Sequence, residues 1–147
     1  LRTVKYSQHI DLALESELEE LLFFNTRQAD YSNDIRQLID AYGMPHIVKN
    51  KMLSIKFDKI ECNTVFATFE DSLLGLFVFN RDSRENIDLV HIAINSDYSS
   101  SGKTGNELLF VKMLLELKRI ASHIKGVETI TFKYGPKCVV KVRKNRG

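Results

Sequence analysis

The 147-residue sequence predicts a single α+β domain with a mixed, mostly antiparallel sheet flanked by helices. Two stretches with helical apolar spacing lie near the start of the chain, and a stronger one covers 107–125. Runs rich in Val, Ile, Phe and Thr lie between and after them, as in β-strands. No Pro-rich or Gly-rich linker separates these parts, so residues 1–147 are expected to share one core.

The first third of the chain is expected to hold a short strand over 1–6 and two helices. The first helix covers 11–25, where Asp11 can cap the start and leucines recur at helical spacing: Leu14, Leu18, Leu21 and Leu22. The second covers 32–43 and ends at Gly43. Residues 46–59 show no clear period, and 51–57 fits either a strand or a helix.

Strands are predicted through the middle of the chain. The runs 63–70 and 73–80 indicate an antiparallel hairpin joined by Asp71 and Ser72. The run 86–95 is almost continuously apolar, which is typical of a central strand covered on both faces.

The strongest helical pattern, 107–125, is amphipathic and ends at Gly126. Its two predicted stripes are apolar (Phe110, Met113, Leu114, Leu117, Ala121, Ile124) and polar (Lys112, Glu116, Arg119, His123). Strands are expected over 127–135 and 137–145. The expected order is therefore strand, two helices, three strands, helix and two strands.

Composition narrows the function classes. No run approaches the roughly 20 apolar residues that cross a bilayer, and residues 1–10 lack the apolar centre of a secretory signal. Cys62 and Cys138 match no disulfide or metal spacing, so we expect reduced thiols, a cytoplasmic protein and no metal site.

The basic segment 133–147 holds six of the 21 Lys and Arg and no acidic residue. Such a tail can bind nucleic acid. An edge strand whose lysines block aggregation is the commoner meaning, and we do not expect a nucleic-acid partner. An exposed last strand could also pair across two chains in a homodimer.

The segment SSSGKTGN (99–106) joins a strand to a helix. The first N–H groups of a helix lack partners, and small residues let them approach a phosphate closely. The predicted phosphate ligands are Ser99, Ser100, Ser101, Gly102, Lys103, Thr104, Gly105 and Asn106, with a plain capped helix start as the alternative. A nucleoside-triphosphate loop is excluded because its first glycine would fall at Asp97.

From about Thr64 to Gly135 the sequence resembles the GNAT family of acyl-CoA-dependent N-acyltransferases. An ordered set carries the resemblance: the hairpin VFATFEDSLLGLFVF with Gly75, the strand and exit DLVHIAINSDY, the loop SSSGKTGNELL and the strand VETITFKYG. The chain departs from the family where Ser99 or Ser100 replaces Gln or Arg at the start of the loop. It also passes almost directly into a strand after VETITFKYG, so a GNAT-like fold would be shortened there.

This resemblance implies direct transfer of an acetyl group from the co-substrate acetyl-CoA to a primary amine of a small molecule or peptide. It implies that loop 99–106 binds the coenzyme diphosphate and that main-chain groups of Ile92, Ala93 and Ile94 hold the pantetheine arm. The many acidic residues of the predicted N-terminal helices are consistent with a basic acceptor, or with a solvated helix face. A non-catalytic coenzyme-binding or regulatory module on the same fold remains the alternative.

Three side chains are candidates for proton transfer. Asp88 lies six residues before Ile94, where the histone-acetyltransferase branch of the family has its glutamate base. His91 is the alternative base and is expected on the opposite face of the strand, because strand side chains alternate. Tyr134 is the candidate donor to the leaving thiolate. Each also has a purely structural interpretation: a solvated strand start for Asp88, and a core residue for the other two.

Overall fold

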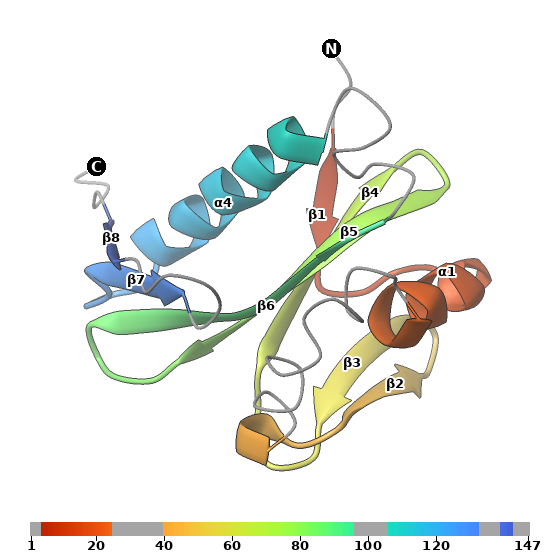
Figure 1. The fold of residues 1–147 in the computed structure, drawn as a ribbon, viewed down its shortest axis with the longest axis horizontal. Coiled ribbons are helices and arrows are strands. Elements are labelled where there is room, and N and C mark those ends of the chain that lie inside the picture. Colours follow the sequence, from red (N-terminus) through yellow and green to blue (C-terminus); the bar gives the residue numbers. More distant parts are fainter. Residues whose placement is uncertain (1–3, 25–39, 96–105, 133–138, 143–147) are drawn as a thin grey trace.

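A computed structural model describes residues 4–24, 40–95, 106–132 and 139–142 of the chain. Its centre is a six-stranded sheet in the order β1-β4-β5-β6-β7-β8 (Figure 1). The strands are β1 (Lys5–Ser7), β4 (Asn63–Phe69), β5 (Ser72–Arg81), β6 (Asn86–Ile94), β7 (Thr129–Phe132) and β8 (Val139–Lys141). The β6–β7 pair is parallel and the other pairs are antiparallel, which confirms the predicted mixed, mostly antiparallel α+β architecture.

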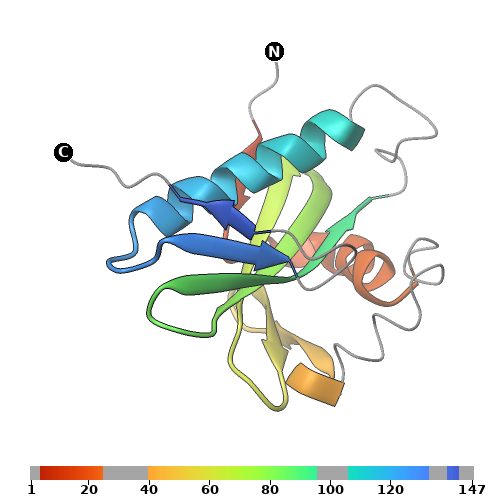
Figure 2. The ribbon, with the colours of Figure 1, turned by 60° about the vertical axis from the view of Figure 1, so that its left-hand side comes forward.

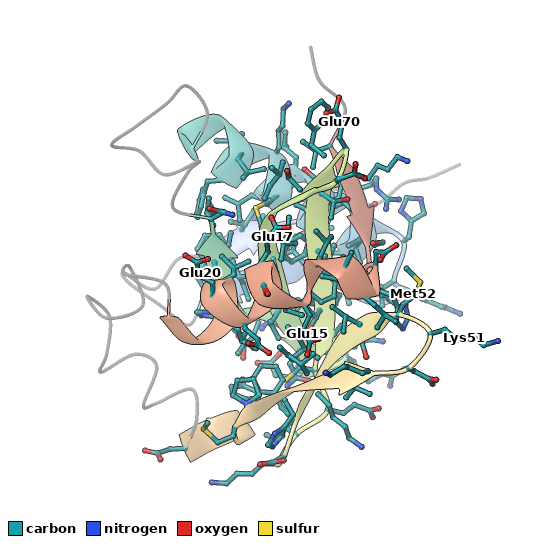
Figure 3. The ribbon with its side chains drawn as sticks, turned by 90° about the vertical axis from the view of Figure 1, so that its right-hand side faces the viewer. Glu15, Glu17, Glu20, Lys51, Met52 and Glu70 are labelled. Atoms are coloured by element: carbon teal, nitrogen blue, oxygen red, sulfur yellow. The ribbon has the colours of Figure 1, made fainter. Side chains whose placement is uncertain are left out.

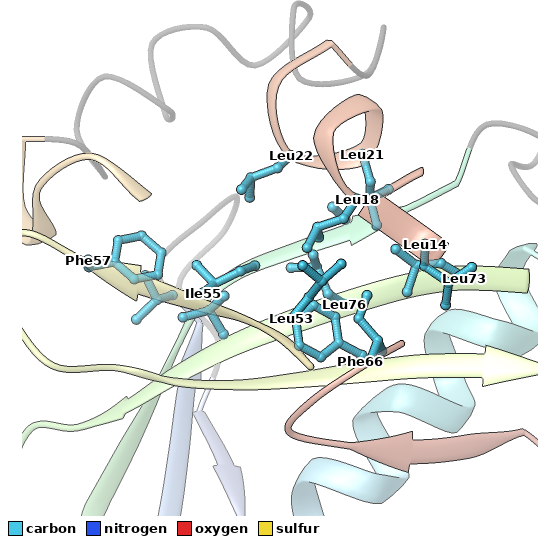
Figure 4. Close-up of a cluster of buried hydrophobic side chains, with 14 of the residues drawn as sticks. Leu14, Leu18, Leu21, Leu22, Leu53, Ile55, Phe57, Phe66, Leu73 and Leu76 are labelled. Carbon is cyan, nitrogen blue, oxygen red and sulfur yellow. The ribbon is translucent and has the colours of Figure 1, made fainter. Parts of the chain in front are cut away.

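The N-terminal helical segment forms because a cap and a leucine stripe coincide. It comprises a 3-10 turn (Leu12–Leu14), α1 (Glu15–Glu19) and a π-helical turn (Glu20–Phe24). The carboxylate of Asp11 accepts a hydrogen bond of 2.8 Å from the Ala13 N–H, as predicted. The four predicted leucines are buried against one face of the sheet (Figure 4).

The second predicted helix, 32–43, lies mostly outside the described residues. Residues 40–42 are helical, and Gly43 adopts φ +89°, a conformation that favours glycine. The helix therefore ends where the sequence predicts. Tyr42, its last residue, is only 5% exposed and packs into the core beside α1.

An additional hairpin follows, consisting of β2 (Pro45–Lys49) and β3 (Leu53–Phe57) in a sheet of their own. This settles 51–57 as a strand. β3 alternates buried and more exposed residues, whereas β2 is largely exposed, so only half of the hairpin carries a period that the sequence could reveal. Reciprocal main-chain hydrogen bonds between Ile10 and Leu53, at 3.1 and 2.7 Å, tie the hairpin to the N-terminal segment.

The β4–β5 hairpin is confirmed, but its turn is formed by Glu70 and Asp71 rather than by Asp71 and Ser72. Ser72 already pairs with Phe69, and Glu70 adopts φ +54°. Next to the turn, a bulge in β5 leaves Leu74 without an opposite residue on β4. β6 then runs through the middle of the sheet and is covered on both faces, as predicted.

Helix α4 (Asn106–Ser122) packs on the sheet face opposite α1 (Figures 1 and 2). The predicted apolar stripe is confirmed, with Met113, Leu117 and Ala121 fully buried. The predicted polar stripe is wrong at Glu116, whose side chain is only 13% exposed and pairs with Arg119 at 2.7 Å. The helix ends three residues early, and Gly126 follows in the turn with φ +93°.

Each face of the sheet therefore has its own core. The first core lies between the sheet, α1 and the β2–β3 hairpin, and the second lies between the sheet and α4. Among the described residues, no helix is long and apolar enough to span a bilayer.

Candidate functional site

Part of the predicted site lies outside the described residues, namely 99–105 and Tyr134. Asn106 is the first residue of α4, so the predicted connection from a strand through the loop to a helix has its two ends in the described structure. The described part of the candidate site is β6 with the residues that pack against it. It is built around Asp88 and His91.

The prediction that Asp88 and His91 occupy opposite faces of the strand is wrong, because β6 is bulged. His91 lies opposite Val78 of β5 and Leu89 lies opposite Phe79, so Val90 is an extra residue between them. The bulge shifts the alternation by one position. His91 pairs with Val78, and Asp88 pairs with Asn80. Val78 and Asn80 are two positions apart on β5, so their side chains share one face of the sheet. Asp88 and His91 therefore both lie on the face covered by α1.

Asp88 is a buried carboxylate, 7% exposed, held by residues of β6 and β7. Its Oδ1 accepts a hydrogen bond from the Thr131 hydroxyl. The two residues lie directly opposite each other in the parallel ladder. The Asn86 side-chain amide is also 3.5 Å from Asp88 Oδ1. A solvated Asp88 at the start of the strand is thereby excluded.

Tyr42 approaches the same carboxylate from the helical segment 40–42. Burial raises the pKa of Tyr42, the negative charge of Asp88 raises it further, and a side-chain hydrogen bond with Asn80 acts in the opposite direction. Asn80 is the cross-strand partner of Asp88, so the half-buried Asn80 links the buried side chains of Tyr42 and Asp88. Sequence reasoning did not identify Tyr42 or Asn80, because neither belongs to a recognisable motif.

His91 is 9% exposed, and burial lowers its pKa to about 4. The imidazole is therefore neutral at pH 7.

The residues directly opposite His91 on the neighbouring strands are Val78 on β5 and then Thr64 on β4. Among the described residues, the Thr64 hydroxyl is buried and has no hydrogen-bond partner. Cys62, two residues earlier, packs against this core, and burial raises the pKa of its thiol to about 11, which makes it a poor nucleophile at neutral pH.

The three residues predicted to hold the pantetheine arm direct their main-chain N–H and C=O groups to different sides of β6. The Asn95 N–H donates to the Leu74 carbonyl at 2.8 Å, one position beyond the Gly75–Ile94 pair. Hydrogen-bonded and non-hydrogen-bonded pairs alternate in antiparallel ladders, so the polar groups of Ala93 also face β5. Those of Ile92 and Ile94 face the other side, where β7 lies. Ala93 is therefore unsuited to the role predicted for it.

Gly75 is required by this arrangement. A Cβ atom at this position would lie 2.6 Å from the Ala93 carbonyl oxygen and 3.5 Å from the Met113 side chain. The strand predicted to hold the coenzyme thus approaches β5 so closely that only glycine fits opposite Ile94.

The acidic residues of α1 are partly engaged in structural contacts. Glu15 pairs with Lys49 at 2.6 Å, and Glu17 Oε1 accepts a hydrogen bond of 3.4 Å from the Leu73 N–H. Figure 3 shows both side chains, with Glu20, on the helix that crosses the sheet. Within the described ranges, no group of three or more His, Cys, Asp or Glu could hold a metal ion.

Comparison with protein-family models, with curated proteins and with solved structures finds no match to this chain.

Proposed function

We propose that the chain is an acyl-CoA-dependent N-acyltransferase that moves an acetyl group from acetyl-CoA to a primary amine of a small molecule or peptide. One observation carries the proposal. β6 runs parallel to β7 and continues past Leu89, the partner of Phe132, for five more residues towards the loop and α4. The main-chain groups of Ile92 are directed away from β5 there, where an extended amide-containing arm could hydrogen-bond to them.

The order and direction of the elements support the same proposal. A parallel pair joined through α4 feeds the glycine-containing loop onto the start of a 17-residue helix, where amides favour a diphosphate. The GNAT resemblance of 64–135 assigns the same segments to the same tasks.

In the proposed reaction the amine nitrogen attacks the thioester carbonyl, the new C–N bond forms and the C–S bond breaks. The ammonium proton passes to Asp88, directly or through one water molecule, and the thiolate accepts a proton, for which Tyr134 is the candidate donor. Asp88 lies six residues from Ile94, or about 20 Å along the strand, and pairs with Thr131 next to the last described β6–β7 pair. Fixed main-chain donors would stabilise the oxyanion without reorganising.

Isothermal titration with acetyl-CoA tests the proposal directly. We expect saturable binding by the unmodified chain and by Asp88→Asn. Turnover of an amine substrate by Asp88→Asn should fall by about 100-fold or more, because a general base contributes roughly that factor. Asp71→Asn, at the exposed β4–β5 turn, is the matched control and should behave like the unmodified chain. Absence of binding at millimolar acetyl-CoA would refute the function.

A non-catalytic coenzyme-binding module is the second candidate. It is favoured by Ser99 or Ser100 in place of the family's Gln or Arg, and by the burial of Asp88, which is only 7% exposed. Acetyl-CoA binding without transfer to any member of a panel of polyamines, amino acids and lysine peptides would support this candidate over the enzyme.

A further inference from the structure

We propose that Thr131 of β7 is the positioning residue for Asp88 and holds its carboxylate in the orientation used for proton transfer. The inference rests on the proposed function and adds a residue to it. Asp88 and Thr131 lie opposite each other on neighbouring strands, 43 positions apart in the chain, and the Thr131 hydroxyl donates to Asp88 Oδ1.

The surrounding hydrogen bonds determine where the proton of the Thr131 hydroxyl points. The Thr129 hydroxyl donates to the Asn86 side-chain carbonyl at 2.7 Å. The two amide protons of Asn86 are then directed at Asp82 Oδ1 and at the Thr131 hydroxyl oxygen, each at 2.9 Å. Because the Thr131 oxygen accepts from Asn86, its own proton is available to Asp88.

This chain of donors suits an ionised carboxylate. A charged acceptor strengthens the hydrogen bond, whereas a protonated Oδ1 would present a second proton to the Thr131 hydroxyl. Tyr42 lies near enough for the charge of Asp88 to act on it, and a side-chain hydrogen bond joins Tyr42 to Asn80, the cross-strand partner of Asp88. The Thr131 hydroxyl therefore donates to Asp88 Oδ1, while the two Asn86 amide protons are directed at Asp82 and at the Thr131 oxygen.

The geometry is maintained by the sheet. Ile87 and Ile130, the neighbouring pair of the same ladder, are 0% and 1% exposed and belong to the α4 core. Their burial fixes the register of the two strands, and the register places Thr131 opposite Asp88. The Asp88 carboxylate is thus held by β7, and the opposite face of β7 packs into the core beneath α4.

The test compares Thr131→Val, Thr131→Ser and Asp88→Asn with the double variant Thr131→Val/Asp88→Asn. We expect Thr131→Val to lower kcat by about 10- to 100-fold, the range for a hydrogen bond to a charged group. Acetyl-CoA affinity should stay within about threefold. Thr131→Ser keeps the hydroxyl and should restore most of kcat. In the Asp88→Asn background the valine substitution should have no further effect on kcat, because it acts through the carboxylate.

Thr68→Val, which removes a half-buried strand hydroxyl on β4, is the matched control. A Thr131→Val variant with unmodified kcat overturns the proposal, as does an equal loss of kcat in the presence and absence of Asp88, which would indicate general strand damage. An unmodified chain that neither binds acetyl-CoA nor acetylates any amine instead refutes the proposed function. The two failures are therefore distinguishable.

Discussion

Thr64 provides the sharpest stability prediction, because its hydroxyl is buried without a partner. Less than 1 Å² of Thr64 Oγ1 is exposed, and no described group accepts from it or donates to it. Burying an unsatisfied hydroxyl costs about 1–3 kcal/mol. Thr64→Val keeps the branched shape that suits a strand and removes this cost.

We expect Thr64→Val to raise the free energy of unfolding by about 1 kcal/mol, the lower end of that range, because cores relax around strained polar groups. For a chain of this size, 1 kcal/mol corresponds to a rise of about 2–4 °C in Tm. Urea unfolding followed by far-ultraviolet circular dichroism measures it, with an unchanged m value as the sign that only stability differs.

Two companion variants make the result specific. Thr68→Val removes a half-buried hydroxyl on the same strand and should change stability by less than about 0.5 kcal/mol. Thr64→Ala removes the hydroxyl and opens a cavity, so it should be less stable than Thr64→Val. The reasoning is refuted if Thr64→Val loses 1 kcal/mol or more, since that loss requires a bonded hydroxyl.

Two further predictions concern Gly75 and His91. Gly75→Ala should destabilise the fold by about 2 kcal/mol, because its Cβ would lie 2.6 Å from the Ala93 carbonyl oxygen, and an unchanged urea midpoint would contradict this close approach. The His91 pKa falls from 6.5 to about 4 on folding, so the unfolded chain binds the extra proton first. Stability should decline by up to about 3 kcal/mol as pH falls from 6.5 to 4, and His91→Gln, but not His123→Gln, should remove most of that decline.

Much of the fold was predictable because its signals are local. The cap at Asp11, the leucines of α1 and the apolar stripe of α4 depend on residues a few positions apart. The same holds for the β4–β5 hairpin and for the apolar character of β6. The β2–β3 hairpin was missed because one of its strands is mostly exposed and carries no alternation.

The candidate site was predicted less completely. Asp88 and His91 were identified from their place on β6, but a one-residue bulge at Val90 reverses their expected relationship. The phosphate-binding role of 99–106 and the role of Tyr134 stay predictions. The partners of Asp88 were not foreseen, since Thr131 follows it by 43 residues and Tyr42 precedes it on a separate element.

The amino-acid sequence by itself determined most of the segments that become strands and helices and the apolar stripes of the helices, because those preferences act over a single turn or a pair of residues. Only the tertiary structure decided that β7 lies beside β6 with Thr131 opposite Asp88, that Tyr42 lies near the same carboxylate, and that the main-chain groups of Ala93 face β5. These arrangements follow from register, and register is set by packing between segments far apart in the chain.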